Sequence, residues 1–310
     1  MKIFDMHCDT LQKLTDLGGN LGDNAYHFDI KRAKMQGCDY IQTFAVFIDR
    51  ESDLLPPFER CRQLIDTYYN QIDKNKEEIM HCKNTADTKT ALESKKIASF
   101  LSIEGGEAIE GKIEKLRYFY EKGVRIMTLC WNYDNEICGG IENNNCGITP
   151  FGKIVVEEMN KIGMLIDVSH ASEQSFWDVI EASEKPIAAT HSNAKKICGH
   201  KRNLTDEQIS AIIKNGGCIG INFYSDFISE NECQISHLLS HIEHILSLGG
   251  ENNIGIGSDF DGMNHLPQGV NGVEDICRII DEMQSCGYSD LLIKKIMAGN
   301  FLNLMKKILI

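Results

Sequence analysis

Eight apolar segments recur along the 310-residue chain, and helix-like stretches separate them. Several are almost continuously apolar rather than strictly alternating, which is typical of parallel strands that are covered on both faces. This succession predicts strands that alternate with helices and pair as a parallel sheet. The strand candidates are Lys2–His7, Asp39–Phe47, Ile97–Glu104, Val124–Trp131, Met164–His170, Pro186–His191, Cys218–Tyr224 and Asn253–Asp259.

The stretches between the strand candidates carry helical periodicity and helix-end signals. Gly152–Lys161 has apolar residues at helical spacing, and Glu173–Ala182 follows Ser172, a favourable N-cap. Thr205–Lys214 opens with Thr-x-x-Gln, which matches a capping box. Eight such alternations predict a (β/α)8 TIM-like barrel, a fold that typically needs about 250 residues. We therefore expect one barrel domain over residues 1–310.

Charge and composition exclude several classes of partner. A net charge of -13 argues against nucleic-acid and anionic-membrane partners, because both require basic surfaces. The first residues show no basic segment followed by an apolar one, so no secretory signal is predicted. The 12 cysteines include no Cys-x-x-Cys pair, and we expect most of them to be reduced. These features favour a soluble cytoplasmic protein.

Six residues that can bind a metal ion or move a proton follow apolar strand candidates. In a parallel barrel the C-terminal ends of the strands meet at one face, where the active site is built. The shared placement therefore indicates one metal-dependent hydrolytic centre assembled from the whole chain. The six residues are His7, Asp9, Glu104, His170, His191 and Asp259.

The spacing of these residues suggests two sets of ligands. His7 and Asp9 lie two residues apart, so on an extended backbone their side chains project to the same side. His170 and His191 end neighbouring strands and can converge on a second metal ion. Glu104 lies between the two sets, where a carboxylate can bridge two cations about 3.5 Å apart.

Five short motifs in order resemble the membrane (renal) dipeptidase family of binuclear zinc peptidases, within the amidohydrolase superfamily. The resemblance covers almost the entire chain. The motifs are Asp-Met-His-Cys-Asp-Thr at 5 to 10, Ser-Ile-Glu-Gly-Gly at 102 to 106, Ile-Asp-Val-Ser-His at 166 to 170, Thr-His-Ser-Asn-Ala at 190 to 194 and Gly-Ser-Asp-Phe-Asp-Gly at 257 to 262.

The resemblance implies two zinc ions per chain. His7, Asp9 and Glu104 would bind one ion, and Glu104, His170 and His191 would bind the other. Asp259 would be the catalytic proton-transfer residue. Asp261 is its rival, and we prefer Asp259 because it comes directly at the strand end.

The resemblance also implies three substrate-binding residues. Arg202 resembles the arginine that binds the substrate's C-terminal carboxylate, and Tyr224 resembles a substrate-contacting tyrosine. Trp131 stands where the animal enzymes have a histidine that approaches the substrate carbonyl. An indole N–H cannot take up a proton, so this departure affects carbonyl polarisation and substrate range. Glu107 would add negative charge if it pointed inward.

The resemblance implies a dipeptidase that uses a metal-bridging hydroxide to hydrolyse small peptides, including those with a C-terminal D-residue, and that forms a homodimer. The stretch from Asn132 to Thr149 is a candidate lid or dimer contact. Another amidohydrolase reaction, on a cyclic amide, lactone or N-acyl amino acid, is the alternative enzyme activity. A metal-binding scaffold without catalysis is the alternative from another class. We expect His237, His241 and His244 to form a solvated helix face rather than a metal site.

Overall fold

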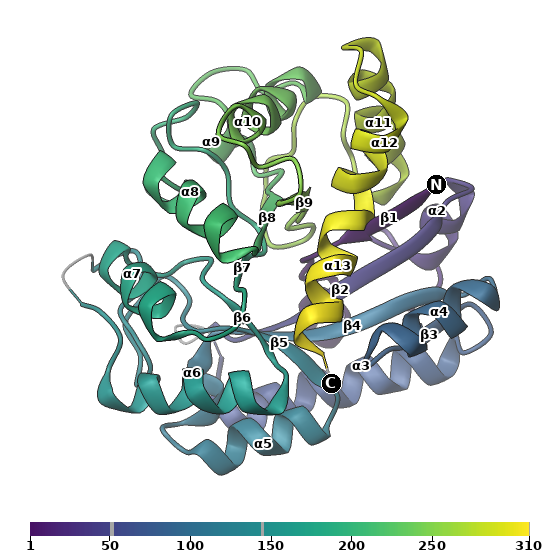
Figure 1. Ribbon diagram of the computed structural model, residues 1–310. Helices are drawn as coiled ribbons and strands as arrows, with labels where there is room; N and C mark the ends of the chain where they lie inside the picture. Colours follow the sequence, from purple (N-terminus) through teal and green to yellow (C-terminus); the bar gives the residue numbers. More distant parts are fainter. Residues whose placement is uncertain (50–52, 144–145, 310) are drawn as a thin grey trace.

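The computed structural model describes residues 1–49, 53–143 and 146–309, and its central feature is a closed parallel barrel (Figure 1). β2 pairs with both β1 and β4, so the sheet closes on itself. Closure confirms the predicted (β/α)8 fold. In order around the barrel the strands are β1 (Lys2–Asp5), β2 (Asp39–Phe47), β4 (Ile97–Glu104), β5 (Val124–Thr128), β6 (Leu165–Asp167), β7 (Ala188–Ala189), β8 (Cys218–Ile221) and β9 (Ile254–Ile256).

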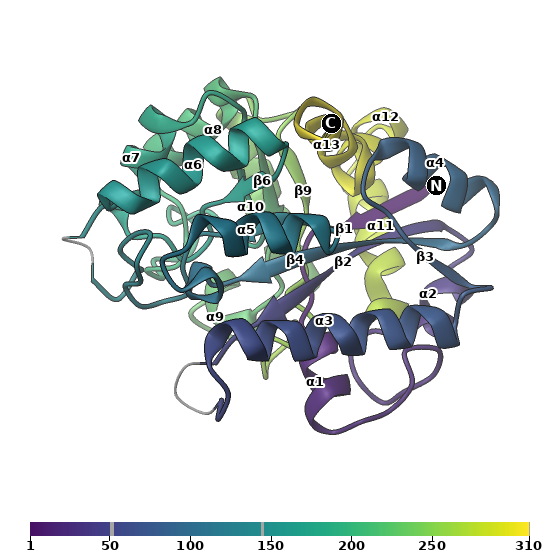
Figure 2. The ribbon, with the colours of Figure 1, turned by 90° about the horizontal axis from the view of Figure 1, so that it is seen from below.

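Helices cover the outside of the barrel, and α3 and α5 run across its β2, β4 and β5 side (Figure 2). The predicted ends of α7 are confirmed, and α8 has the predicted capping box at Thr205. The helices are α1 (Thr10–Asp16), α2 (Ile30–Met35), α3 (Pro57–Lys74), α4 (Thr85–Glu93), α5 (Ile113–Glu121), α6 (Pro150–Ile162), α7 (Glu173–Ala182), α8 (Asp206–Asn215), α9 (Ser225–Ile228), α10 (Ile235–Ser247), α11 (Ile276–Ser285), α12 (Asp290–Lys294) and α13 (Asn300–Ile308).

The strands differ from the prediction in two ways. Six of them end two or three residues earlier than expected, because the chain leaves the ladder where the polar residues begin. A ninth strand, β3 (Ile79–His81), was not expected and pairs with the first residues of β4 outside the closed ring. Its sequence, Ile-Met-His, has only two apolar residues and is too short to stand out as an apolar run.

Side chains of alternate strand residues point into the barrel and form layers. Toward the N-terminal ends of the strands the inward side chains are apolar and include Phe4, Phe100 and Leu165. α13 closes this end, and Phe301 packs edge-on against Phe4 with ring centroids 4.5 Å apart. On β4 the alternation continues upward through Ser102 to Glu104, so the inward positions become polar toward the C-terminal end.

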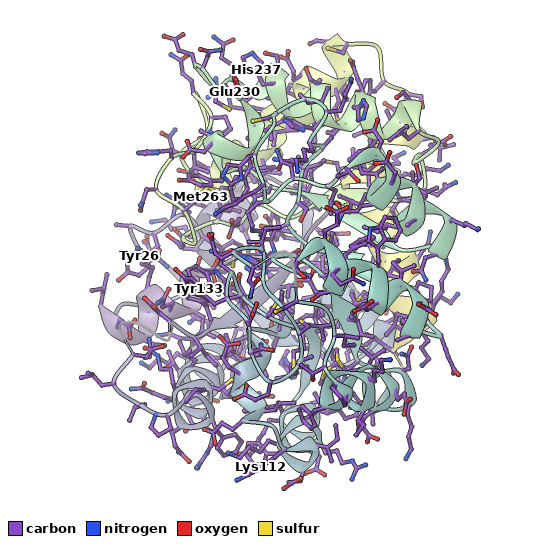
Figure 3. All side chains as sticks on the ribbon, turned by 90° about the vertical axis from the view of Figure 1, so that its left-hand side faces the viewer. Tyr26, Lys112, Tyr133, Glu230, His237 and Met263 are labelled. Carbon is purple, nitrogen blue, oxygen red and sulfur yellow. The ribbon has the colours of Figure 1, made fainter. Side chains whose placement is uncertain are left out.

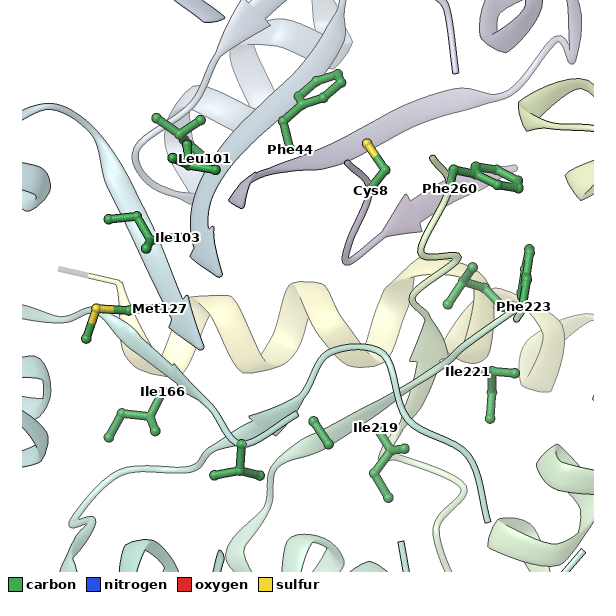
Figure 4. Close-up of a cluster of buried hydrophobic side chains, with 14 of the residues drawn as sticks. Cys8, Phe44, Leu101, Ile103, Met127, Ile166, Ile219, Ile221, Phe223 and Phe260 are labelled. Atoms are coloured by element: carbon green, nitrogen blue, oxygen red, sulfur yellow. The ribbon is translucent and has the colours of Figure 1, made fainter. Parts of the chain in front are cut away.

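The opposite side chains of the strands form the larger core between barrel and helices. Figure 4 shows Leu101, Ile103, Met127, Ile166 and Ile219 arranged around the ring, with α13 crossing behind it. These residues are buried against apolar side chains of the surrounding helices. Burial on both faces explains why the strand segments read as almost continuous apolar runs.

The C-terminal ends of β1, β2 and β4 lie toward the left of Figure 1, and Figure 3 views the molecule from that side. Tyr133, from the loop after β5, and Met263, from the loop after β9, lie on this side. All twelve cysteines are described and all are free thiols, as expected. No helix within the described residues is both long and apolar enough to cross a membrane.

Gly220 tests the tight packing beneath the C-terminal face. A Cβ atom there would lie 1.9 Å from the carbonyl oxygen of Thr190, which belongs to the neighbouring strand end. Gly220→Ala is therefore expected to lower the free energy of unfolding by about 3 kcal/mol, because backbone must move to admit the methyl group. Urea denaturation measures this loss. Gly199→Ala is the control, since its Cβ would meet only Glu230 Oε1 at 3.6 Å; equal losses would contradict the steric account.

Candidate metal centre and substrate cavity

The predicted ligands converge at the C-terminal end of the barrel. Glu104 is the last residue of β4, whereas the three histidines lie in loops two or three residues beyond β1, β6 and β7. All five predicted ligands are buried, with exposed fractions of 8% or less. Their side chains nevertheless reach one another across the barrel mouth, so the structure brings together His7, Asp9, Glu104, His170 and His191.

One half of the centre is formed by the loops after β1 and β9. His7 Nε2 lies 3.4 Å from Asp9 Oδ2, 3.1 Å from Glu104 Oε2 and 4.0 Å from Asp259 Oδ1. One potential ligand atom each from His7, Asp9 and Asp259 lies within 4.8 Å of the others, as metal coordination requires.

The other half uses the second oxygen of the same glutamate. Glu104 Oε1 lies 2.9 Å from His170 Nε2 and 3.6 Å from His191 Nε2. The two imidazole Nε2 atoms are 2.8 Å apart. The two oxygens of Glu104 therefore face different groups of potential donor atoms.

The backbone at two of these loops is strained. His170 has a φ of 68° and Asp259 a φ of 63°, in the left-handed region that residues other than glycine rarely adopt. Strain of this kind costs on the order of 1–3 kcal/mol and persists at functional sites, where surrounding contacts hold it. Each of these two residues lies three positions beyond the end of a short strand, in a loop at the barrel mouth.

Burial and charge set the ionisation of the centre. Burial, followed by the positive charge of Arg202, lowers the pKa of His170 to about 3, and burial also lowers the pKa of His191. These histidines are thus neutral, the form in which imidazole binds metal. Burial opposes ionisation of Glu104, but the neighbouring histidines hold its pKa well below the usual range.

The first half of the centre carries excess negative charge. Burial, followed by the charge of Glu104, raises the pKa of Asp9 well above its usual value. Burial alone would lower the pKa of His7, yet Glu104 and Asp9 raise it well above normal. Both shifts show that positive charge is favourable here, whether a proton or a metal ion supplies it.

The donors fit divalent cations. Neither oxygen of the buried Asp9 accepts a hydrogen bond among the described residues, and its contact with His7 Nε2 at 3.4 Å is shared with Glu104, so the burial of this carboxylate is costly unless a cation is present. Near Glu104 Oε1, two neutral imidazole nitrogens and a carboxylate oxygen crowd together, and their lone pairs repel unless a positive ion lies between them. Nitrogen and oxygen donors in this combination suit zinc.

The two candidate aspartates have different partners. Asp259 has a side chain 14% exposed, lines the cavity and accepts a hydrogen bond at Oδ2 from Asn222 Nδ2 at 2.9 Å. Asp261 also borders the cavity, but its carboxylate accepts hydrogen bonds from the Thr10 hydroxyl and the His27 backbone. Asp261 is therefore tied to a loop, whereas Asp259 Oδ1 faces His7.

A cavity of about 360 Å³ opens above the centre. Trp131, Tyr224 and Arg202, the three predicted substrate-binding residues, all line it. Arg202 is only 6% exposed, and no described residue accepts a hydrogen bond from its Nε or Nη2. These two nitrogens form one edge of the planar guanidinium, an edge suited to a carboxylate.

Sequence reasoning did not single out other residues that line the cavity. They are Gln12, Phe47, Asn132, Glu142, His200, Lys201, Phe227 and Gly262. Signals existed for some of them: Gly262 ends one of the five motifs, Asn132 and Glu142 fall within the candidate lid, and the alternation along β2 places Phe47 on the inward face at the strand end.

Two further expectations meet different outcomes. Glu107 is buried, and its carboxylate accepts a hydrogen bond from Asn135 Nδ2 at 3.0 Å in the loop after β5.

The expectation that His237, His241 and His244 form a solvated helix face was wrong for His241, which is fully buried. Its ring accepts a hydrogen bond from the Ala194 backbone N–H and contacts the Ile228 carbonyl oxygen, so it anchors the loop after β7.

Known proteins are similar to this chain in sequence. The family model for membrane dipeptidase, peptidase family M19, matches residues 1–309. An uncharacterized dipeptidase of Schizosaccharomyces pombe is 31% identical over 91% of this chain and 72% of its own. An uncharacterized protein of Klebsiella pneumoniae, from the pqqA 5' region, is 32% identical over 79% of this chain and 97% of its own.

Solved structures of metallopeptidases are similar to this chain in fold and in sequence. A Rhodobacter sphaeroides metallopeptidase, liganded with a phosphinate mimic of the dipeptide L-Ala-D-Ala, has a TM-score of 0.92 and 25% identity, with 99% of each chain covered. A family M19 dipeptidase has a TM-score of 0.90 and 27% identity, covering 100% of this chain and 99% of its own. Because the family match spans nearly the whole sequence, the chain belongs to the membrane dipeptidase family, peptidase family M19, and is a metallopeptidase by that membership.

Proposed function

We propose that this protein is a two-zinc dipeptidase that hydrolyses small peptides with a free C-terminal carboxylate. The observation that carries the proposal is the division of the Glu104 carboxylate between two donor sets, one oxygen 3.1 Å from His7 and the other 2.9 Å from His170. The solved relative that holds an L-Ala-D-Ala mimic supports a dipeptide substrate, including one with a C-terminal D-residue.

The distances among the donors support two proposed metal positions. His7, Asp9 and Glu104 would hold one zinc ion, and Glu104, His170 and His191 would hold the other. Zinc ions held there would supply Lewis-acid chemistry, which would lower the pKa of a bound water toward neutrality and polarise the scissile carbonyl. The protein contributes buried, negatively charged donors at the bottom of the cavity.

Asp259 is the proposed proton carrier. Its Oδ1 faces the metal ligands, and Asn222 holds its Oδ2, so one oxygen stays available at a fixed position. In that place the carboxylate can accept a proton from the attacking water and deliver it to the leaving amine. The bonded carboxylate of Asp261 suits a supporting role in its loop.

Arg202 is proposed to select the substrate by its C-terminal carboxylate. The guanidinium is buried beside the cavity with the Nε and Nη2 edge open among the described residues. Phe227 lies under the guanidinium, 5.5 Å from Cζ to the ring centroid, and restricts its movement. The distance from this arginine to the metal ligands then limits the length of the peptide.

Trp131 and Tyr224 are proposed as walls of the substrate cavity. The indole of Trp131 packs against Phe47 and lies 6.0 Å from the ring of His170, measured between centroids. It presents apolar surface where the resembled animal enzymes have a histidine, so carbonyl polarisation falls to the metals. Tyr224 packs on Phe227 on the Arg202 side. We also propose a homodimer, as the family resemblance implies, which light scattering tests.

Glu104→Gln tests the bridge between the metal positions. A neutral amide is a poor bridge between two cations, so elemental analysis should find fewer than two zinc ions per chain and turnover should fall with them. Glu107→Gln is a matched control, because that buried carboxylate lies three residues away and bonds Asn135 instead. Full zinc content and normal turnover in Glu104→Gln would exclude the bridging role.

Asp259→Asn keeps the shape of the side chain but cannot accept a proton. Zinc content should remain at the wild-type level while kcat falls about 100-fold or more. Steady-state kinetics with a dipeptide, alongside metal analysis, measure both quantities. Asp261→Asn is the control, and a larger catalytic loss there would assign proton transfer to Asp261.

Arg202→Ala tests carboxylate recognition and separates the dipeptidase from a lactonase or cyclic-amide hydrolase. kcat/KM for free dipeptides should fall by about 2–3 kcal/mol, the contribution of a hydrogen-bonded charge pair. Dipeptide amides lack that charge, so they should be poor substrates and almost insensitive to the change. Lys201→Ala controls for loss of a neighbouring positive charge, since Lys201 already pairs with Glu142. Equal losses for acids and amides would exclude this role.

A further inference from the structure

The two histidines of the second donor set are held from behind by different groups. His191 Nδ1 lies 2.9 Å from the hydroxyl of Thr190, which in turn donates to Asp167 Oδ2 at 2.6 Å. Asp167 belongs to β6 and also accepts a hydrogen bond from Thr128 of β5. All these side chains are buried in the barrel wall, so the ring of His191 is fixed by the strands themselves.

His170 is held by a loop instead. Its Nδ1 lies 2.7 Å from Oδ1 of Asn132, in the loop after β5. Because Nε2 faces Glu104 and His191, Nδ1 must carry the proton and donate it to the amide oxygen. Asn132 is half-buried and lines the substrate cavity, unlike the fully buried support of His191.

The same loop is fastened to the backbone around His170. Ile141 N–H donates to the His170 carbonyl oxygen at 2.8 Å, and Glu142 N–H donates to the Asn132 carbonyl oxygen at 2.9 Å. A Cβ at Gly140 would lie 2.4 Å from the backbone of Asn132, so these segments touch without space between them. Residues 139–142 therefore cannot move far without moving Asn132 and the ring it supports.

Resting on the two-zinc proposal, we infer that Asn132 is a positioning residue that couples the cavity loop to zinc binding at His170. The amide oxygen fixes both the tautomer and the orientation of the imidazole, as partners of ligand histidines do elsewhere. Trp131, Asn132 and Glu142 line the cavity, so the loop that meets the substrate is the one that holds the ligand. Coupling of this kind is reciprocal: zinc orders the loop, and an ordered loop retains zinc.

Zinc affinity, measured by chelator competition, tests the inference. Asn132→Ala removes the hydrogen-bond acceptor of the His170 ring and should lower the affinity for one of the two zinc ions by about 10–100-fold, as loss of a residue that supports a ligand histidine typically does. Asn132→Asp keeps an acceptor oxygen in the same place and should bind zinc at least as tightly as wild type. A purely structural role predicts the opposite for Asn132→Asp, because it puts an additional charge into the loop.

Asn143→Ala is the matched control within the same loop. Its side chain donates to Asp134 Oδ2 at 2.7 Å and to Cys146 Sγ, neither of which is a proposed zinc ligand. Both zinc affinities should stay at the wild-type level. A loss equal to that of Asn132→Ala would show that any loosening of the loop has the same effect, which would overturn the specific role of Asn132.

Hydrogen exchange of the wild-type protein tests whether zinc binding orders the loop, and this measurement does not require that any variant folds. Removal of zinc should speed amide exchange in residues 132–142 far more than in α5. In Asn132→Ala, the difference between zinc-loaded and zinc-free protein should shrink. No zinc effect on this segment, or unchanged zinc affinity in Asn132→Ala, would overturn the coupling. Fewer than two tightly bound zinc ions in wild type would instead count against the proposed function.

Discussion

The buried carboxylate of Glu104 is the group on which the rest of the centre depends. A buried carboxylate in a barrel mouth is costly unless positive charge lies beside it, and here one oxygen faces His7, whose pKa is raised, while the other faces the neutral His170 and His191, a place suited to a cation. Its place at the end of β4 follows from simple alternation, because the inward positions of that strand lead upward from Phe100 to Ser102 to Glu104. The apolar lower layers thus support a polar upper one.

Two other buried carboxylates hold the strand ends that carry the ligands. Asp5 of β1 accepts hydrogen bonds from the backbone and hydroxyl of Ser258 and from the His7 N–H, and burial raises its pKa to about 6. Asp167 of β6 makes the corresponding links to Thr128 and Thr190. Neither touches the cavity. Each adds side-chain hydrogen bonds to the backbone bonds that continue beyond the short strands, so both kinds of bond hold the ligand loops.

Apolar runs followed by polar residues predicted the barrel and also the candidate ligands that lie close together in the structure, because both patterns follow from burial. The exact strand ends could not be predicted from the sequence. β7 is reduced to Ala188–Ala189, because the backbone N–H of Thr190 donates a hydrogen bond to the side chain of Asp167 rather than to a neighbouring strand. Cavity residues such as Glu142 and Lys201 depend on how long loops fold back, which local patterns do not encode. The expectation of one domain over residues 1–310 stays a prediction, as do the individual site roles.

The position of the first donor set has a consequence for folding. β1 and β9 pair through a single register contact, Asp5 with Ile256, and His7 and Asp259 come directly after this seam. Closing it joins residues some 250 positions apart, which is the slowest kind of contact for a chain to form. The proposed cation at His7, Asp9 and Glu104 needs donors from the β1 loop and from β4, which meet only in the folded barrel, so it would stabilise that state by mass action. The proposed metal centre would thus also stabilise the closed barrel.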